Sequence, residues 1–184
     1  MKGIVIYKGK YGATQQYAEW LGQDLNLPVV ATRDINEDQL KKYDFILLGT
    51  SVYIGKLQIK KWLTDNVTFL RNKKIFLFQV AATPVEEKEK RQAYNLSGIP
   101  EEILNNFEFY FLPGRMVMQK LSWKDRIMLK MGARLIKDAV AKKKMLTDYN
   151  DVKEENIGEI PGKVKNYLQA EMPAVTTQES VLQF

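Results

Sequence analysis

Two glycines and a threonine follow the β-branched run at residues 4–6, and this combination is suited to binding an anion. Glycine lets backbone N–H groups turn inward, and the helical pattern that follows would add the partial positive charge of a helix N-terminus. The sequence therefore predicts a phosphate-binding loop, with an ordinary turn whose lysines face water as the alternative. The residues of this loop are Lys8, Gly9, Lys10, Tyr11, Gly12, Ala13 and Thr14.

Two residue types that commonly carry out catalysis are missing, because the 184 residues include no histidine and no cysteine. Their absence excludes disulfides, thiol chemistry and cysteine metal sites, and it removes the usual general base and the commonest metal ligand. A cofactor would therefore carry the chemistry of any enzyme built on this sequence. Neither G-x-G-x-x-G nor G-x-x-x-x-G-K-[ST] occurs in the loop, so it differs from the common dinucleotide and triphosphate loops.

Apolar runs alternate with helical patterns along the chain, which predicts an α/β domain over residues 1–172 and a polar tail at 173–184. Strands are expected at 4–6, 28–32, 44–49, 74–81 and 107–112, and the longer helices at 57–67, 86–91, 122–144 and 162–171. Such an alternation predicts a five-stranded parallel sheet in the order 2-1-3-4-5, with helices on both faces. In this order the ligand lies at the switch point, beside the first and third strands.

The loops after the third and fourth strands should then meet the same ligand. The loop at 50–55 contains Tyr53, whose ring could stack on a flat ligand, and Gly55, which permits close backbone approach. A surface tyrosine and a helix-entry glycine are the alternative explanation. The predicted contacts of these two loops are Ser51, Val52, Tyr53, Ile54, Gly55, Ala82 and Thr83.

The first loop resembles that of the flavodoxin family, in which a hydroxyl- and glycine-rich turn wraps the phosphate of FMN. Gly12 and Thr14 fit that pattern, whereas Lys8 and Gly9 stand where serine or threonine is usual. A lysine can replace a hydroxyl contact with a charge-assisted one. The resemblance implies a flavodoxin-like fold with bound FMN.

A second resemblance, spread over residues 3–171, is to quinone-dependent protoporphyrinogen oxidases of flavodoxin fold. It rests on the stretch W-K-D-R-I-M at 123–128, Gly114-Arg115, T-D-Y at 147–149 and G-T-S-V at 49–52. It implies an FMN-dependent oxidoreductase that takes electrons from a porphyrinogen-like substrate, passes them to a quinone and belongs to heme biosynthesis. An electron-carrier flavodoxin and an FMN-free interaction protein of the same fold are the alternatives.

Positive charge is concentrated between residues 120 and 144, which hold nine of the 28 basic residues and two acidic ones, while the whole chain carries +6. The helix expected at 122–144 places four cations on one stripe beside a broad apolar face. Such a helix suits an anionic membrane surface or the docking of another protein, or it packs on the sheet with its stripe in water. Aromatic residues other than Trp123 are missing from the segment, which argues against nucleic-acid binding. The stripe consists of Arg126, Lys130, Arg134 and Lys137.

No apolar run is long enough to span a membrane, and a strand rather than a signal peptide is expected directly after Met1. These features predict a cytoplasmic protein, with peripheral attachment to the inner face of the membrane through the basic stripe.

Overall fold

The computed structural model describes residues 1–171, apart from the side chains of residues 141 and 144, so the expected tail at 173–184 lies outside the described residues. The five parallel strands are β1 (Gly3–Lys8), β2 (Val29–Ala31), β3 (Phe45–Tyr53), β5 (Lys74–Ala81) and β6 (Phe107–Pro113). Their order in the sheet is β2-β1-β3-β5-β6, which confirms the predicted order 2-1-3-4-5.

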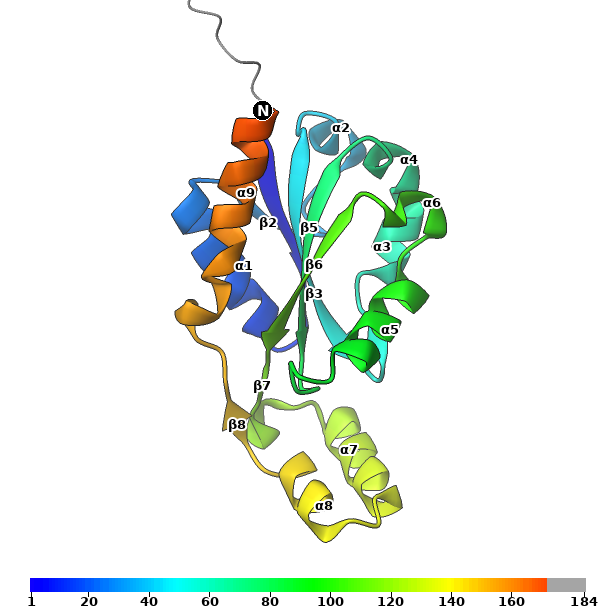
Figure 1. The fold of residues 1–184 in the computed structure, drawn as a ribbon. Helices are drawn as coiled ribbons and strands as arrows, with labels where there is room; N and C mark the ends of the chain where they lie inside the picture. Colours follow the sequence, from blue (N-terminus) through cyan, green and yellow to red (C-terminus); the bar gives the residue numbers. More distant parts are fainter. Residues whose placement is uncertain (172–184) are drawn as a thin grey trace, which may run out of the picture.

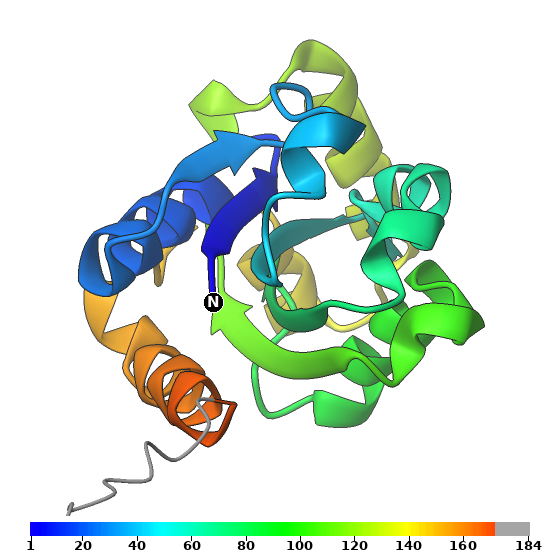
Figure 2. The same cartoon turned by 90° about the horizontal axis from the view of Figure 1, so that it is seen from above.

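Helices cover both faces of this sheet, as two perpendicular views show (Figure 1, Figure 2). One face carries α1 (Ala13–Leu25) and α9 (Glu159–Ala170) (Figure 1). The other face carries α2 (Glu37–Leu40), α3 (Lys60–Asp65), α4 (Val67–Leu70), α5 (Lys88–Gly98) and α6 (Glu101–Leu104). The α/β class with helices on both faces is therefore confirmed.

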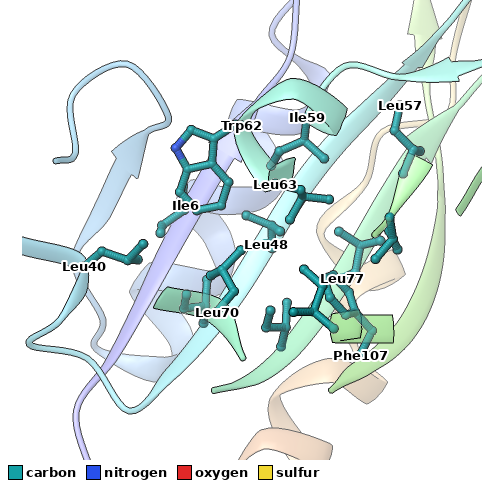
Figure 3. Packing of buried hydrophobic residues seen from close by; sticks show 14 of the residues in the cluster. Ile6, Leu40, Leu48, Leu57, Ile59, Trp62, Leu63, Leu70, Leu77 and Phe107 are labelled. Carbon is teal, nitrogen blue, oxygen red and sulfur yellow. The ribbon is translucent and has the colours of Figure 1, made fainter. Parts of the chain in front are cut away.

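Each central strand contributes side chains to two hydrophobic cores, one on each face of the sheet, because successive side chains of a strand point to opposite faces. In β1, Ile4 and Ile6 join one core and Val5 joins the other. The first core packs Trp62 and other residues of the helical layer against the strands, as the close view shows (Figure 3). Burial on both faces is the reason that these strands appear in the sequence as uninterrupted apolar runs.

The region after the third strand differs from the prediction. The strand continues to Tyr53, turns through Ile54 and Gly55, and pairs antiparallel with β4 (Lys56–Leu57). The helix expected at 57–67 is consequently two shorter helices, α3 and α4. Residues 50–55 are therefore mostly strand rather than loop, although they still lie at the predicted edge of the sheet.

The prediction of one continuous helix at 122–144 is also wrong. The segment forms a hairpin of two helices, α7 (Trp123–Leu135) and α8 (Ala139–Met145), with Ile136 in an extended conformation after α7. An aspartate, Asp138, directly precedes α8, and aspartate is favoured at helix starts. Because α7 ends at Leu135, Lys137 does not belong to the stripe formed by the other three cations.

The α7–α8 hairpin, defined here as residues 122–145, projects from the end of the sheet at which β1, β3 and β5 finish (Figure 1). Its base is a small antiparallel sheet of β7 (Arg115–Met116) and β8 (Tyr149–Asn150). Short 3₁₀ helices flank it, namely η1 (Met118–Lys120) and η2 (Glu154–Ile157). Within residues 1–171, no helix has the length and apolar character that crossing a membrane requires.

Candidate functional site

A cavity of about 410 Å³ lies between the carboxyl ends of the parallel strands and the α7–α8 hairpin. Nine of the fourteen predicted site residues line it: Lys10, Tyr11, Ala13, Thr14, Ser51, Val52, Tyr53, Ile54 and Ala82. The other five belong to the same segments without lining the cavity: Lys8, Gly9, Gly12, Gly55 and Thr83. The topological switch point thus brings most of the predicted residues together.

The first helix begins without a side-chain cap. Its N-cap residue, Gly12, has a φ of +82°, and the first turn contains no acidic residue. The N-terminus therefore presents unsatisfied N–H groups together with the positive end of the helix dipole. Thr14 in this turn is buried, and its hydroxyl makes no hydrogen bond with another described residue. These groups fit an anion such as a phosphate.

Gly9 gives the Thr14 side chain the space that it occupies. A Cβ atom at Gly9 would lie 2.7 Å from Thr14 Oγ1 and 2.8 Å from Thr14 Cβ, which no real contact allows. A larger residue would therefore push the hydroxyl away from the helix N-terminus. Glycine at position 9 is therefore compatible with phosphate binding, because it leaves the Thr14 hydroxyl beside the helix N-terminus.

Arg115 adds a full positive charge beside the same helix end. A Cβ atom at Gly12 would lie 2.9 Å from Arg115 Nη2, so the guanidinium is close to the N-terminus of α1. Among the described residues, Arg115 forms no ion pair and no side-chain hydrogen bond. A cation beside the positive end of a helix dipole is unfavourable alone, and a bound anion would relieve this.

The sequence pointed to Arg115 only as part of a turn and not as a site residue. Its position depends on the pairing of Arg115 with Asn150 in β7 and β8, which are 35 positions apart in the chain. No local pattern reveals a pairing at that separation. The only available signal was an arginine directly after the last parallel strand.

A second polar group that the prediction missed is Gln58, which also lines the cavity. The Ser51 hydroxyl donates to Gln58 Oε1 at 2.5 Å, and the Gln58 backbone N–H donates to the Ser51 carbonyl oxygen at 3.0 Å. The side-chain amide nitrogen of Gln58 makes no hydrogen bond in the described part of the chain. It can therefore donate to a carbonyl oxygen of a ligand.

The turn between β3 and β4 contains a strained residue at the cavity wall. Ile54 has a φ of +50° and Gly55 a φ of +67°, as a two-residue hairpin turn of type I′ requires. A positive φ is rare for a β-branched residue. Strain of this kind concentrates at binding sites, and the Ile54 side chain is exposed and lines the cavity.

Replacing Ile54 by Asn should raise the free energy of unfolding by about 1 kcal/mol, because Asn tolerates positive φ and Asn-Gly is the preferred sequence for this turn. Urea denaturation measures the change. The matched control is Ile54→Val, which stays β-branched and should retain the strain. Equal stability of the two variants would contradict this explanation.

Asp125 joins the hairpin to the predicted phosphate loop. Its carboxylate accepts hydrogen bonds from Lys10 Nζ at 2.6 Å, from the Tyr53 hydroxyl at 2.5 Å and from the Tyr11 hydroxyl. The Asp125 side chain is only 7% exposed. Three of the predicted site residues thus hold the first turn of α7 over the cavity. The sequence did not indicate Asp125 as a site residue, because each of these contacts joins positions more than 70 residues apart in the chain.

The charge state of this cluster is well defined. Burial alone would raise the pKa of Asp125, but the hydrogen bonds from Lys10, Tyr11 and Tyr53 outweigh it and hold that pKa well below its usual range. The hydrogen bond to Asp125 likewise raises the pKa of Lys10. A carboxylate with a lowered pKa stabilises the fold above its unfolded-state pKa and loses this contribution only as the pH falls through the folded value. The contact therefore persists in mild acid.

Lys10 also limits how a ligand can use Tyr53. Its ammonium lies 4.4 Å from the centroid of the Tyr53 ring, so it covers one face of that ring. A flat ligand that stacks on Tyr53 would use the opposite face. The predicted stacking stays a prediction.

The fold and the cavity define a class of protein: a doubly wound α/β domain with an uncapped helix N-terminus after its first strand and a mostly apolar cavity beside it. The profile of the family described as "Flavodoxin domain" matches residues 4–143. The chain therefore belongs to the flavodoxin-domain family.

Individual relatives are more distant. An uncharacterized protein of Methanocaldococcus jannaschii is 31% identical over 114 residues, which cover 58% of this chain and 73% of that protein. A WrbA-like flavodoxin from Agrobacterium tumefaciens is 20% identical with a TM-score of 0.47, covering 68% of this chain and 87% of its own. A flavoprotein in complex with FMN from Lactobacillus acidophilus is 17% identical with a TM-score of 0.45, and the match covers 61% of this chain and 91% of that protein.

Proposed function

We propose that this chain binds FMN in the cavity and acts as a flavodoxin-type redox protein that passes electrons between partners. The observation that carries the proposal is the uncapped N-terminus of α1, faced by Arg115 and adjoining an apolar cavity. When bound, FMN supplies the exchange of one or two electrons. Membership of the flavodoxin-domain family supports the same function.

The phosphate of FMN would occupy the N-terminus of α1. The backbone N–H groups of the first turn and the Thr14 hydroxyl would donate to it, and Arg115 would neutralise its charge. Lys10 would contribute less, because Asp125 already pairs with its ammonium. One phosphate can satisfy these donors together, whereas riboflavin, which has no phosphate, cannot.

The ring system of FMN would lie between the β3–β4 turn and the α7–α8 hairpin. Apolar side chains from the hairpin side, including Leu121, Met128 and Met145, would keep water from it. The Gln58 amide nitrogen would donate to a carbonyl oxygen at the polar edge of the ring. A mostly apolar wall with one or two oriented polar groups is the usual composition of a cofactor pocket.

Flavin titration of the purified chain tests the proposal. We expect the fluorescence of FMN to be quenched on binding. FMN should bind at least tenfold more tightly than riboflavin, since charge-assisted hydrogen bonds to a phosphate are worth about 1.5–3 kcal/mol each. FAD should bind less tightly than FMN, because the loop lacks the G-x-G-x-x-G pattern that binds the pyrophosphate of a dinucleotide. Equal affinities for FMN and riboflavin would contradict the phosphate site.

A second candidate function is an FMN-dependent oxidoreductase that transfers electrons from a porphyrinogen-like substrate to a quinone, as the motif resemblance implies. The observation that favours it is the α7–α8 hairpin, which projects from the end of the sheet (Figure 1) and lines the cavity with Met128, Leu129 and Met145, so it would contact a substrate bound beside the flavin. The cavity volume of about 410 Å³ lies in the lower part of the usual range for ligand pockets, which is about 300–1,000 Å³. A substrate as large as a porphyrinogen would therefore require the hairpin to open.

Porphyrin fluorescence distinguishes the two functions. FMN-loaded protein, reduced porphyrinogen and a menaquinone analogue are mixed, and the appearance of porphyrin is compared with the uncatalysed oxidation. A rate above that background supports the oxidoreductase. No increase, with FMN bound, leaves the electron carrier as the function.

A further inference from the structure

The α7–α8 hairpin exposes most of the large apolar side chains that lie on the described surface. Six of the nine such residues belong to it, among them Trp123 at 66% exposure and Leu135 at 85%. The six are Trp123, Ile127, Met128, Met131, Leu135 and Val140. A concentration of exposed apolar side chains on one element favours an interaction site over ordinary surface variation.

The same hairpin carries the positive charge of the protein. Seven of its basic residues are exposed, whereas one of its two acidic residues, Asp125, is buried against Lys10. The exposed basic residues are Lys124, Arg126, Lys130, Arg134, Lys137, Lys142 and Lys143. The pairing of Asp125 inside the molecule therefore leaves the outer surface strongly cationic.

The two kinds of side chain share one side of α7. At about 100° per residue, Trp123, Ile127, Met131 and Leu135 fall along one arc, and Arg126, Lys130 and Arg134 fall along a second arc that overlaps the first near Trp123. The opposite side, with Asp125, Leu129 and Gly132, lines the cavity. The apolar and cationic arcs therefore point away from the site and are available to a partner.

We propose that the α7–α8 hairpin attaches the protein to an anionic lipid bilayer, with its apolar arc in the interface and its cations against the headgroups. The inference is independent of whether FMN binds. Amphipathic helices with basic polar faces lie in membrane interfaces in this way, and tryptophan is enriched at that depth. Lys124, whose ammonium lies 5.6 Å from the centroid of the Trp123 ring, can reach the headgroups from the apolar arc.

A bilayer fits this surface better than a second copy of the chain. Two hairpins placed face to face would bring like charges together, which destabilises an interface. An anionic leaflet attracts the cations and accepts the apolar side chains at once, without requiring a complementary shape. Charge complementarity therefore selects the lipid as the occupant.

Co-sedimentation with vesicles tests the charge contribution. The variant Lys130→Gln, Arg134→Gln, Lys137→Gln keeps helix-forming side chains and removes three cations. Each cation near an anionic leaflet is worth about 1 kcal/mol, so the partition coefficient on phosphatidylserine-containing vesicles should fall roughly a hundredfold. The matched control removes three exposed lysines outside the hairpin, Lys2→Gln, Lys42→Gln and Lys163→Gln, and should bind nearly as well as the unmodified protein.

A second variant tests the apolar arc. Ile127→Gln, Met131→Gln and Leu135→Gln together should also abolish most of the binding, whereas Leu96→Gln, at an exposed position on α5, should not. Brominated lipids should quench the fluorescence of Trp123 in the unmodified protein, and Trp123→Phe should remove that quenching. Thermal melting of each variant checks that it is folded.

The outcomes are distinct. Binding to anionic but not to neutral phosphatidylcholine vesicles, lost in both hairpin variants and retained in both controls, supports the proposal. No binding by the unmodified protein, or an equal loss in the charge control, overturns it. If vesicles do not bind while the protein forms a dimer that the apolar variant dissociates, the occupant is a second copy and the proposal is wrong.

Discussion

Replacing Arg115 by Glu should weaken FMN binding by about two orders of magnitude or more. The Arg115 guanidinium lies beside the N-terminus of α1, where the phosphate would bind. The variant loses charge-assisted hydrogen bonds worth about 1.5–3 kcal/mol and adds a carboxylate that repels the phosphate. A combined change of roughly 3 kcal/mol corresponds to a hundredfold or larger increase in Kd.

Fluorescence titration with FMN and with riboflavin localises this effect. The Kd for FMN should rise sharply, whereas that for riboflavin should change little, because riboflavin has no phosphate for Arg115 to contact. Arg33→Glu is the matched control, since Arg33 is exposed and, within residues 1–171, pairs only with its neighbour Asp34. An FMN affinity that is unchanged in the Arg115 variant would place the phosphate elsewhere.

The strands of the sheet could be predicted from the sequence because each strand is indicated by its own run of apolar residues. Each strand of the parallel sheet is buried on both faces, so its residues form an apolar run that stands out from the helical patterns around it. β5, with Ile75 to Val80 buried throughout, is the clearest case. The order of the strands followed from general rules of α/β connections, and the edge of the sheet at which the cavity lies followed from the order.

The details of the site were less predictable, because they depend on contacts between distant segments. The pairing of Asp125 with Lys10 spans 115 positions, and the approach of Arg115 to Gly12 spans about as many. The turn at Ile54 was missed for a different reason: isoleucine is a poor residue for positive φ, so nothing in the local sequence indicates a tight hairpin there. Each of these residues lies where tertiary structure overrides local preference.

Arg91 also makes contacts between segments that are distant in the sequence, in this case inside the protein core. It is fully buried in α5, yet no carboxylate forms an ion pair with it among the described residues. Its Nη2 donates to the carbonyl oxygens of Gln79 and Leu112, both at 2.7 Å, and its Nε donates to Gln79 Oε1 at 3.0 Å. Arg91 thereby ties α5 to the ends of β5 and β6.

The charge of Arg91 is retained at neutral pH. Burial lowers the pKa of its guanidinium to about 10, which is still well above 7. Its Cζ lies 5.1 Å from the centroid of the Phe111 ring, whose face attracts the cation. Its Nη1 atom is buried without a hydrogen-bond partner in the described structure. The three hydrogen bonds, rather than an opposite charge, therefore compensate the cost of burying this side chain.

Replacing Arg91 by Met should lower the free energy of unfolding by about 3 kcal/mol or more, since an unpaired buried acceptor costs about 1–3 kcal/mol and three acceptors lose their donor. The melting temperature should fall by roughly 6–12 °C. Arg71→Met is the matched control, because Arg71 is half-exposed and pairs with Glu102 at the surface, where an ion pair is worth less than about 1 kcal/mol. Differential scanning calorimetry measures both variants. Similar melting temperatures for the two would mean that the Arg91 hydrogen bonds contribute no more than a surface ion pair, and that α5 is held in place by its apolar contacts alone.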